Sequence, residues 1–133
     1  MNVSDLDASV HFYCLALAPL GFQKADGEKG QYARLTDELS SVIVLCPAGA
    51  KHRDLAYHRK AIGLGHFALA VESKDIVDQM AEHLATLGVP LLGEGKIELG
   101  YRRGYYTLAF EDPDRIMIEI VYHDPYYFSL APP

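Results

Sequence analysis

The chain has 133 residues, 50% of them hydrophobic and 23% charged, a balance that suits one globular domain and excludes an intrinsically disordered chain. Eighteen acidic against twelve basic residues give a formal net charge of −6, so we expect no nucleic-acid partner. No apolar run approaches the ~20 residues of a membrane span, and no signal peptide is recognisable. Cys14 and Cys46 form no disulfide framework, which fits a reducing cytosol. We therefore expect a soluble cytoplasmic protein without a membrane partner.

The first half of the chain predicts one helix followed by two strands. Ser4 suits a helix N-cap, and apolar residues recur at helical spacing over residues 5–18. Residues 26–30 are rich in turn formers. The runs 31–36 and 41–46 resemble strands, and the second is apolar enough to predict a buried strand.

The second half predicts a strand, a helix and three more strands. Ser73 suits the N-cap of the helix, which we expect over residues 73–87. The predicted strands lie at 66–72, 96–101, 105–111 and 116–122, with turns at 102–104 and 112–115.

Two residue matches relate the halves at an offset of 68 positions: Val3 with Val71 and Asp7 with Asp75. The repeated element order predicts two similar modules within one domain. We place module 1 at about residues 1–50, a connector at 51–61, module 2 at about 62–123 and a C-terminal tail at 124–133.

Three motifs resemble the vicinal oxygen chelate (VOC) superfamily, which includes glyoxalase I, bleomycin-binding proteins, fosfomycin-modifying transferases and extradiol dioxygenases. The resemblance implies an α+β fold of paired β-α-β-β-β modules that form a U-shaped sheet around a cavity. Its motifs are the opening Val3-Ser4-Asp5-Leu6-Asp7 with Leu20-Gly21-Phe22, the run Gly65-His66-Phe67-Ala68-Leu69-Ala70-Val71, and Asp112-Pro113-Asp114 followed by Ile118-Glu119-Ile120-Val121.

The same resemblance implies that His66 and Glu119 are ligands of a divalent metal, for which Zn, Mn, Fe and Ni are the candidates. Strand alternation places the small residues Ala68 and Ala70 on the face of His66, which leaves room beside the imidazole. The alternative is that Glu119 lies on a solvated sheet face and that His66 is an ordinary strand residue.

A catalytic metal site usually has at least three protein ligands. The offset between the modules places the counterpart of His66 before Met1, and residues 41–46 offer no carboxylate or imidazole. We therefore expect the chain to begin inside or after its first strand, with that strand truncated and with metal binding weak or absent. A truncated first strand leaves a sheet edge unpaired, which predicts a homodimer.

Aromatic and basic residues cluster around the turn at 102–104. Tyr101 and Tyr106 could stack on a substrate and donate hydrogen bonds to it, and Arg103 could hold an anionic group. The alternative is a hairpin turn with exposed arginines and core tyrosines. In the same region, the superfamily usually has Gly after Asp-Pro-Asp where this chain has Arg115. If the turn requires a left-handed residue, Arg costs about 1–2 kcal/mol more than Gly.

The sequence thus predicts a metal-dependent enzyme of glyoxalase or dioxygenase type that activates a small oxygen-rich substrate by Lewis-acid chemistry. Glu119 could also serve as general base when the substrate displaces it from the metal. The alternative is a non-catalytic protein of the bleomycin-resistance type, which would sequester a small molecule in the same cavity.

Overall fold

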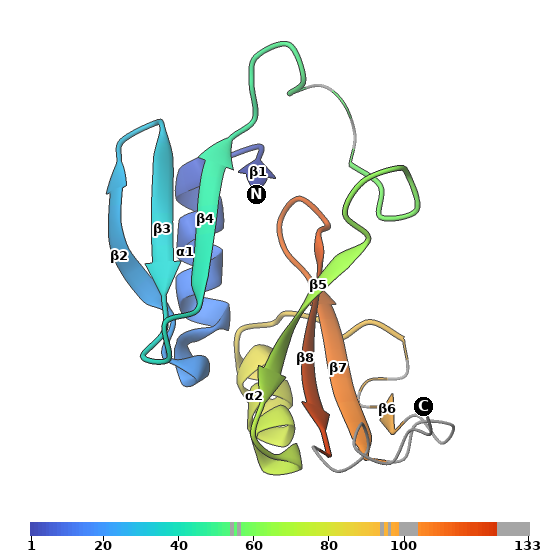
Figure 1. Ribbon diagram of the computed structural model, residues 1–133. Coiled ribbons are helices and arrows are strands. Elements are labelled where there is room, and N and C mark those ends of the chain that lie inside the picture. Colours follow the sequence, from blue (N-terminus) through green and yellow to red (C-terminus); the bar gives the residue numbers. More distant parts are fainter. Residues whose placement is uncertain (54, 56, 94, 96, 99–103, 125–133) are drawn as a thin grey trace, which may run out of the picture. The chain divides into compact units, whose positions relative to one another are not determined.

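The computed structural model describes all residues except 54, 56, 94, 96, 99–103 and 125–133 (Figure 1). It contains two four-stranded sheets, each with one α-helix, and confirms the predicted α+β class. The chain divides into two compact units, Met1–Ala61 with Asp112–Ile116, and Ile62–Glu111 with Met117–Pro133. Among the described residues, no helix is both long and apolar enough to cross a membrane.

The first unit is a sheet of strand order β1-β4-β3-β2 in which β1 runs parallel to β4 and the other pairs are antiparallel. As expected, the first strand is short, because only two residues of it pair with β4. The elements are β1 (Asn2–Val3), α1 (Leu6–Ala16), a 3-10 turn (Ala18–Leu20), β2 (Gln23–Glu28), β3 (Tyr32–Thr36) and β4 (Val42–Pro47).

Helix α1 begins one residue later than the sequence predicted. Its N-cap is Asp5, whose Oδ1 accepts a hydrogen bond from the Ala8 backbone N–H at 3.0 Å. The backbone N–H of Ser4 instead donates to Asp114 Oδ2 at 2.8 Å. The prediction of Ser4 as N-cap was therefore wrong, because the side chain of the neighbouring Asp5 takes that role.

Strand β2 was missed, since we expected a turn-rich stretch at 26–30. All six residues of β2 are exposed, so the strand carries no apolar alternation that could reveal it. Gly27 allows close pairing with β3, because a Cβ atom there would lie 2.6 Å from the Tyr32 carbonyl oxygen. Residues 26–28 of the predicted turn-rich stretch thus belong to an edge strand, and the turn follows at residues 29 and 30.

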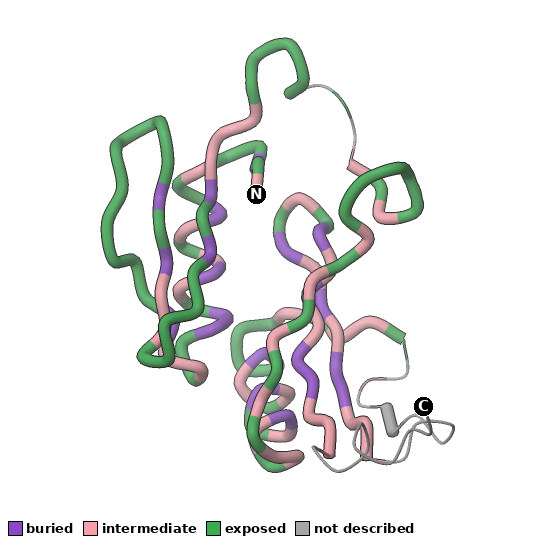
Figure 2. The backbone as a smooth tube through the Cα atoms, viewed as in Figure 1, coloured by how far each residue is buried: buried purple, intermediate pink, exposed green. Residues whose placement is uncertain are grey.

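The sequence predicted a buried strand at residues 41–46, and strand β4 is buried on one face only. Ile43 and Leu45 are buried, while Val42 and Val44 are 51% and 40% exposed (Figure 2). Helix α1 packs against β3 and β4 and covers one face of the sheet.

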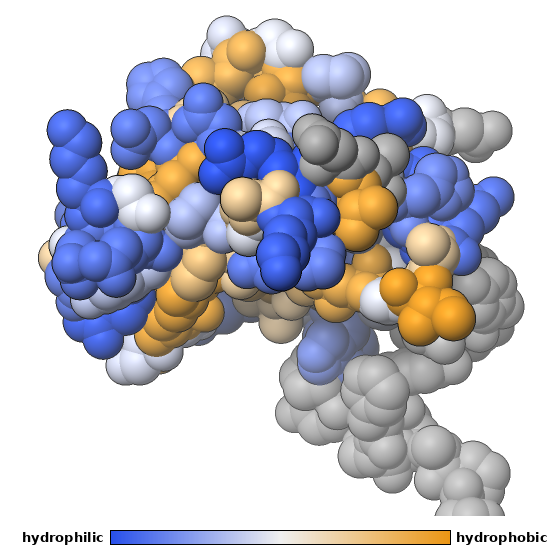
Figure 3. Space-filling view, turned by 90° about the horizontal axis from the view of Figure 1, so that it is seen from above, coloured by the Kyte–Doolittle hydropathy of each residue, from blue (hydrophilic) through white to orange (hydrophobic). Residues whose placement is uncertain are grey.

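Other large hydrophobic side chains also lie at the surface, among them Leu39, Leu55 and Ile62. Figure 3 shows hydrophobic residues interspersed with hydrophilic ones on one face of the molecule.

The second unit is a sheet of strand order β5-β8-β7-β6 in which β5 and β8 are parallel. Ser73 caps its helix as predicted, since its Oγ accepts a hydrogen bond from the Ile76 N–H at 3.3 Å. The predicted strand at 96–101 is described only over Ile97–Glu98. The elements are β5 (His66–Val71), α2 (Lys74–Thr86), β6 (Ile97–Glu98), β7 (Tyr105–Glu111) and β8 (Met117–His123).

Strand alternation decides which face of this sheet is available for a site. Helix α2 packs on β7 and β8 over one face, where apolar side chains are buried. The opposite face carries the other set of side chains, including His66, Thr107 and Glu119. The core side chains on the helix-covered face include Leu108, Phe110, Ile118 and Ile120 of the strands with Val77, Met80 and Leu84 of α2.

The turn between β7 and β8 belongs to the first unit, where Asp112 is 4% exposed. Asp112 accepts hydrogen bonds from the Tyr13 hydroxyl at 2.9 Å and from the backbone N–H groups of Asp114 at 2.9 Å and Ile116 at 2.8 Å. Burial raises the pKa of Asp112 above its ordinary value, and burial beside this carboxylate raises the pKa of Tyr13. Arg115 has φ 65°, so this turn does use a left-handed residue.

Candidate functional site

The candidate site lies on the face of β5, β7 and β8 that α2 does not cover. The parallel register of β5 and β8 places Ala68 level with Glu119, and His66 level with Met117. The antiparallel register of β7 and β8 places Thr107 level with Val121. His66 and Thr107 therefore flank Glu119 diagonally, one from each neighbouring strand.

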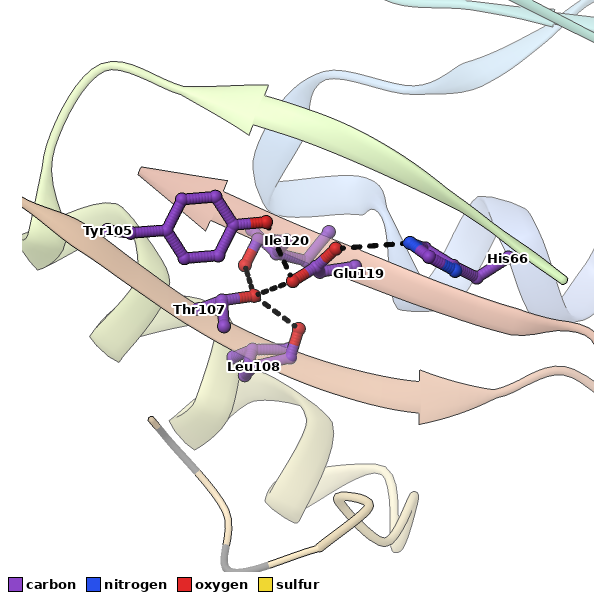
Figure 4. A network of polar contacts seen from close by, with 6 residues as sticks. All are labelled: His66, Tyr105, Thr107, Leu108, Glu119 and Ile120. Carbon is purple, nitrogen blue, oxygen red and sulfur yellow. Dashed lines mark hydrogen bonds and ion pairs between the residues drawn. The ribbon is translucent and has the colours of Figure 1, made fainter. Parts of the chain in front are cut away.

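The two carboxylate oxygens of Glu119 have different surroundings (Figure 4). Oε1 accepts hydrogen bonds from Thr107 Oγ1 at 2.8 Å and from the Tyr105 hydroxyl at 3.1 Å. Oε2 lies 3.6 Å from His66 Nε2. The Glu119 side chain is 14% exposed and that of His66 is 48% exposed, so the imidazole is the more accessible of the pair. The hydroxyls thus hold one oxygen while the other is directed to the imidazole.

Thr107 was not among the predicted site residues. Threonine is common in β-strands for conformational reasons alone, so its presence in an apolar strand does not point to a function. The available signal was alternation, which places Thr107 and Glu119 on the same face once β7 and β8 are recognised as a hairpin. Tyr105 faces the same way, and its hydroxyl completes the pair of donors to Oε1.

The donor set of His66 and Glu119 suits a transition-metal ion, because imidazole nitrogen and carboxylate oxygen are both common ligands of such ions. The separation of 3.6 Å between Nε2 and Oε2 is longer than a hydrogen bond. It is also shorter than the sum of a zinc–nitrogen and a zinc–oxygen bond, about 4.0–4.3 Å, so one ion could contact both atoms. In the part of the chain that the structure describes, no three His, Cys, Asp or Glu residues are grouped around a common point.

The predicted substrate residues do not gather at this cluster. Tyr101 and Arg103 lie outside the described residues. Tyr106 lies on the opposite face of β7 from Thr107, where its hydroxyl donates to Asp78 Oδ1 at 2.9 Å. The Lys74 ammonium lies 5.3 Å from the centroid of the Tyr106 ring. Of the predicted site residues that are described, the structure brings together His66 and Glu119.

The chain belongs to the glyoxalase/bleomycin resistance protein/dioxygenase superfamily, whose family model matches residues 1–120. This superfamily is the VOC superfamily that the sequence motifs resemble, and it contains many enzymes. Its members commonly bind a divalent metal ion and typically bind small-molecule substrates.

Individual proteins show the same relationship. The chain is 36% identical to the Bacillus subtilis (strain 168) protein YqjT over 121 aligned residues. The alignment covers 91% of this chain and 93% of that protein. The crystal structure of a proposed glyoxalase from Bacillus halodurans superposes with a TM-score of 0.78 at 27% identity, over 91% of this chain and 90% of that one. Lactoylglutathione lyase from Agrobacterium tumefaciens shares the fold, with a TM-score of 0.67 at 23% identity, over 91% and 87% of the two chains.

Proposed function

We propose that the face of β5, β7 and β8 is an active site at which His66 Nε2 and Glu119 Oε2 hold a divalent metal ion. The observation that supports it best is the asymmetry of the Glu119 carboxylate. Two hydroxyl donors hold Oε1, while Oε2 lies 3.6 Å from the imidazole. A carboxylate on an ordinary solvated sheet face needs no such restraint, whereas metal ligands are typically fixed by outer hydrogen bonds.

The substrate class follows from the chemistry and from the space beside Glu119. A bound divalent ion would act as a Lewis acid on oxygen atoms of the substrate. Ala68, level with Glu119 on β5, is exposed and small, so a compact ligand can approach the carboxylate over this strand. We infer a small substrate with two neighbouring oxygens, such as an α-hydroxycarbonyl compound or a catechol, consistent with the similarity to glyoxalase-like proteins.

Glu119 has a second role in this proposal, as general base. The two hydroxyl groups donate to Oε1, so Oε2 would be the oxygen that accepts a proton from a bound substrate. Thr107 and Tyr105 keep donating to Oε1, so the carboxylate stays in place during the transfer. His66 would hold the ion from β5, which lies on the other side of β8 from β7.

A second candidate function is ligand binding without catalysis. It is favoured by one observation, namely that the described residues contain no group of three metal-ligating side chains. Such a protein would hold a small molecule on the same face, with Glu119 and Tyr105 as polar contacts. The two candidates differ in whether Glu119 is needed for turnover or only for binding.

The test is a turnover assay with a panel of α-hydroxycarbonyl compounds and catechols, with and without added Zn²⁺, Mn²⁺, Fe²⁺ or Ni²⁺. We expect turnover that requires an ion and falls by at least about 100-fold in Glu119→Gln, which keeps the size of the side chain but loses the base. Tyr106→Phe is the control, because it removes a hydroxyl from the opposite face of β7. Saturable binding of a panel compound without turnover under any ion would favour the binding protein.

We also propose that the chain forms a homodimer. Exposed hydrophobic side chains support this, since Leu39, Leu55 and Ile62 are 79%, 70% and 109% exposed.

A further inference from the structure

We propose that Thr107 is a positioning residue, which determines that Glu119 presents a single oxygen, Oε2, toward His66 and an ion held there. The inference rests on the proposed function and deepens it. Thr107 is not itself a metal ligand in this account, and it acts only through the carboxylate of Glu119.

The distances around the Thr107 hydroxyl favour Glu119 as its acceptor. Oγ1 lies 2.8 Å from Glu119 Oε1, 2.9 Å from the Ile120 carbonyl oxygen and 3.3 Å from the Leu108 carbonyl oxygen. A threonine hydroxyl has one proton, so it can donate fully to only one of these three oxygens. The carboxylate oxygen is the closest and carries charge, and charge-assisted hydrogen bonds are the stronger ones.

Thr107 is itself rigidly held, which a positioning residue must be. It is 7% exposed and lies on β7, between β8 and β6 in the sheet. Its branched Cβ restricts the first side-chain torsion, so the hydroxyl has little freedom to move away. Tyr105 also donates to Oε1, at 3.1 Å, but from the end of a longer and half-buried side chain. Thr107 is therefore the firmer of the two restraints.

The consequence concerns how the carboxylate can bind an ion. The terminal torsion of a glutamate side chain has a broad energy profile, so an unrestrained carboxylate rotates easily. With Oε1 held by Thr107, rotation is prevented and Oε2 stays directed to the imidazole. Without the hydroxyl, the carboxylate would lose this orientation before the ion binds. Loss of such outer hydrogen bonds typically costs about 10–100-fold in metal affinity.

The experiment is a titration with Co²⁺, followed by its visible absorption, of the full chain and four variants. Thr107→Val keeps the shape but removes the hydroxyl, and Thr107→Ser keeps the hydroxyl. Glu119→Gln tests the site itself, and Thr36→Val makes the same change on β3 in the other unit. Thermal unfolding without the ion establishes that each variant is folded, and Thr107→Ala replaces Thr107→Val under the same expectations if Thr107→Val does not fold.

We expect Thr107→Val to weaken Co²⁺ binding about 10-fold or more and to alter the absorption band, because the coordination changes. Thr107→Ser should bind within about twofold of the original chain, and Thr36→Val should be unchanged. If Thr107→Val binds normally while Glu119→Gln does not, the role of Thr107 is wrong and the proposed site stands. Equal loss in Thr107→Val and Thr107→Ser would indicate packing and overturn the inference. Normal binding by Glu119→Gln would overturn both the inference and the proposed function.

Discussion

His66 and Glu119 lie on neighbouring parallel strands but two residues out of register, and their side chains still come within 3.6 Å between Nε2 and Oε2. His66 is level with Met117, and the residue level with Glu119 is Ala68. Side chains two residues apart on adjacent strands are within reach of each other when they are long. The short side chain of Ala68 thus lets the imidazole and the carboxylate approach each other along the sheet face.

The buried pair of Tyr13 and Asp112 predicts a stability effect far from the candidate site. Tyr13→Phe removes the hydroxyl that donates to Asp112 Oδ2 at 2.9 Å and leaves a buried carboxylate with one donor fewer. We expect the free energy of unfolding to fall by about 1–3 kcal/mol in urea denaturation. Tyr32→Phe on the exposed face of β3 is the control and should change little. Equal losses in the two variants would contradict the account.

Asp112 also predicts how stability depends on pH. Burial raises its pKa above the ordinary 3.8, so the folded state holds the proton more tightly than the unfolded state does. Ionisation of Asp112 therefore destabilises the folded state. This destabilisation grows as pH rises from 3.8 toward the raised pKa, and it disappears as pH falls. Asp112→Asn does not titrate. We expect the free energy of unfolding of the original chain, relative to Asp112→Asn, to decrease between about pH 3 and pH 7. A constant or increasing difference would contradict the raised pKa.

The sequence was informative where local chemistry decides the structure. Ser73 caps α2 through its own side chain, and strand β7 has the predicted bounds, Tyr105–Glu111. It was misleading at the start of α1, where Asp5 and not Ser4 is the N-cap, because Asp and Ser side chains are about equally good caps. Strand β2 escaped prediction because no residue of it is buried, so hydrophobic periodicity carried no signal.

The candidate site shows the same division. The family motifs indicated His66 and Glu119, and the structure brings these two side chains together. Thr107 could not be assigned from the sequence, because its role depends on the pairing of β7 with β8 and on a single distance of 2.8 Å to Glu119. Tyr106 differs from Tyr105 by one position only, and alternation sends it to the opposite face and to Asp78.

The left-handed conformation of Arg115 predicts a stabilising substitution. Arg115 has φ 65°, a region in which a side chain costs about 1–2 kcal/mol and in which glycine is unstrained. We expect Arg115→Gly to raise the free energy of unfolding by about 1 kcal/mol, since part of the gain is offset by the greater freedom of glycine in the unfolded chain. Arg53→Gly is the matched control, because Arg53 is also exposed but has no positive φ. It should be neutral or destabilising, and a similar gain in both variants would show that strain at Arg115 is not the cause.

The proposed homodimer predicts the mass of the particle in solution. Light scattering over a range of concentrations should give twice the mass of one chain, because association covers exposed hydrophobic side chains such as Leu39 and Ile62. A particle with the mass of one chain at the highest concentration would contradict association.

Metal binding by His66 and Glu119 is tested most directly by calorimetric titration of Zn²⁺ and Mn²⁺ into the metal-free chain, His66→Ala and Glu119→Gln. We expect one ion per chain, bound weakly for a metalloprotein, since the described residues offer two ligands and leave other positions to water. Each substitution should weaken binding by at least about 10-fold, while Tyr106→Phe, on the opposite face of β7, should bind as the original chain does. Unchanged affinity in either His66→Ala or Glu119→Gln would contradict the account.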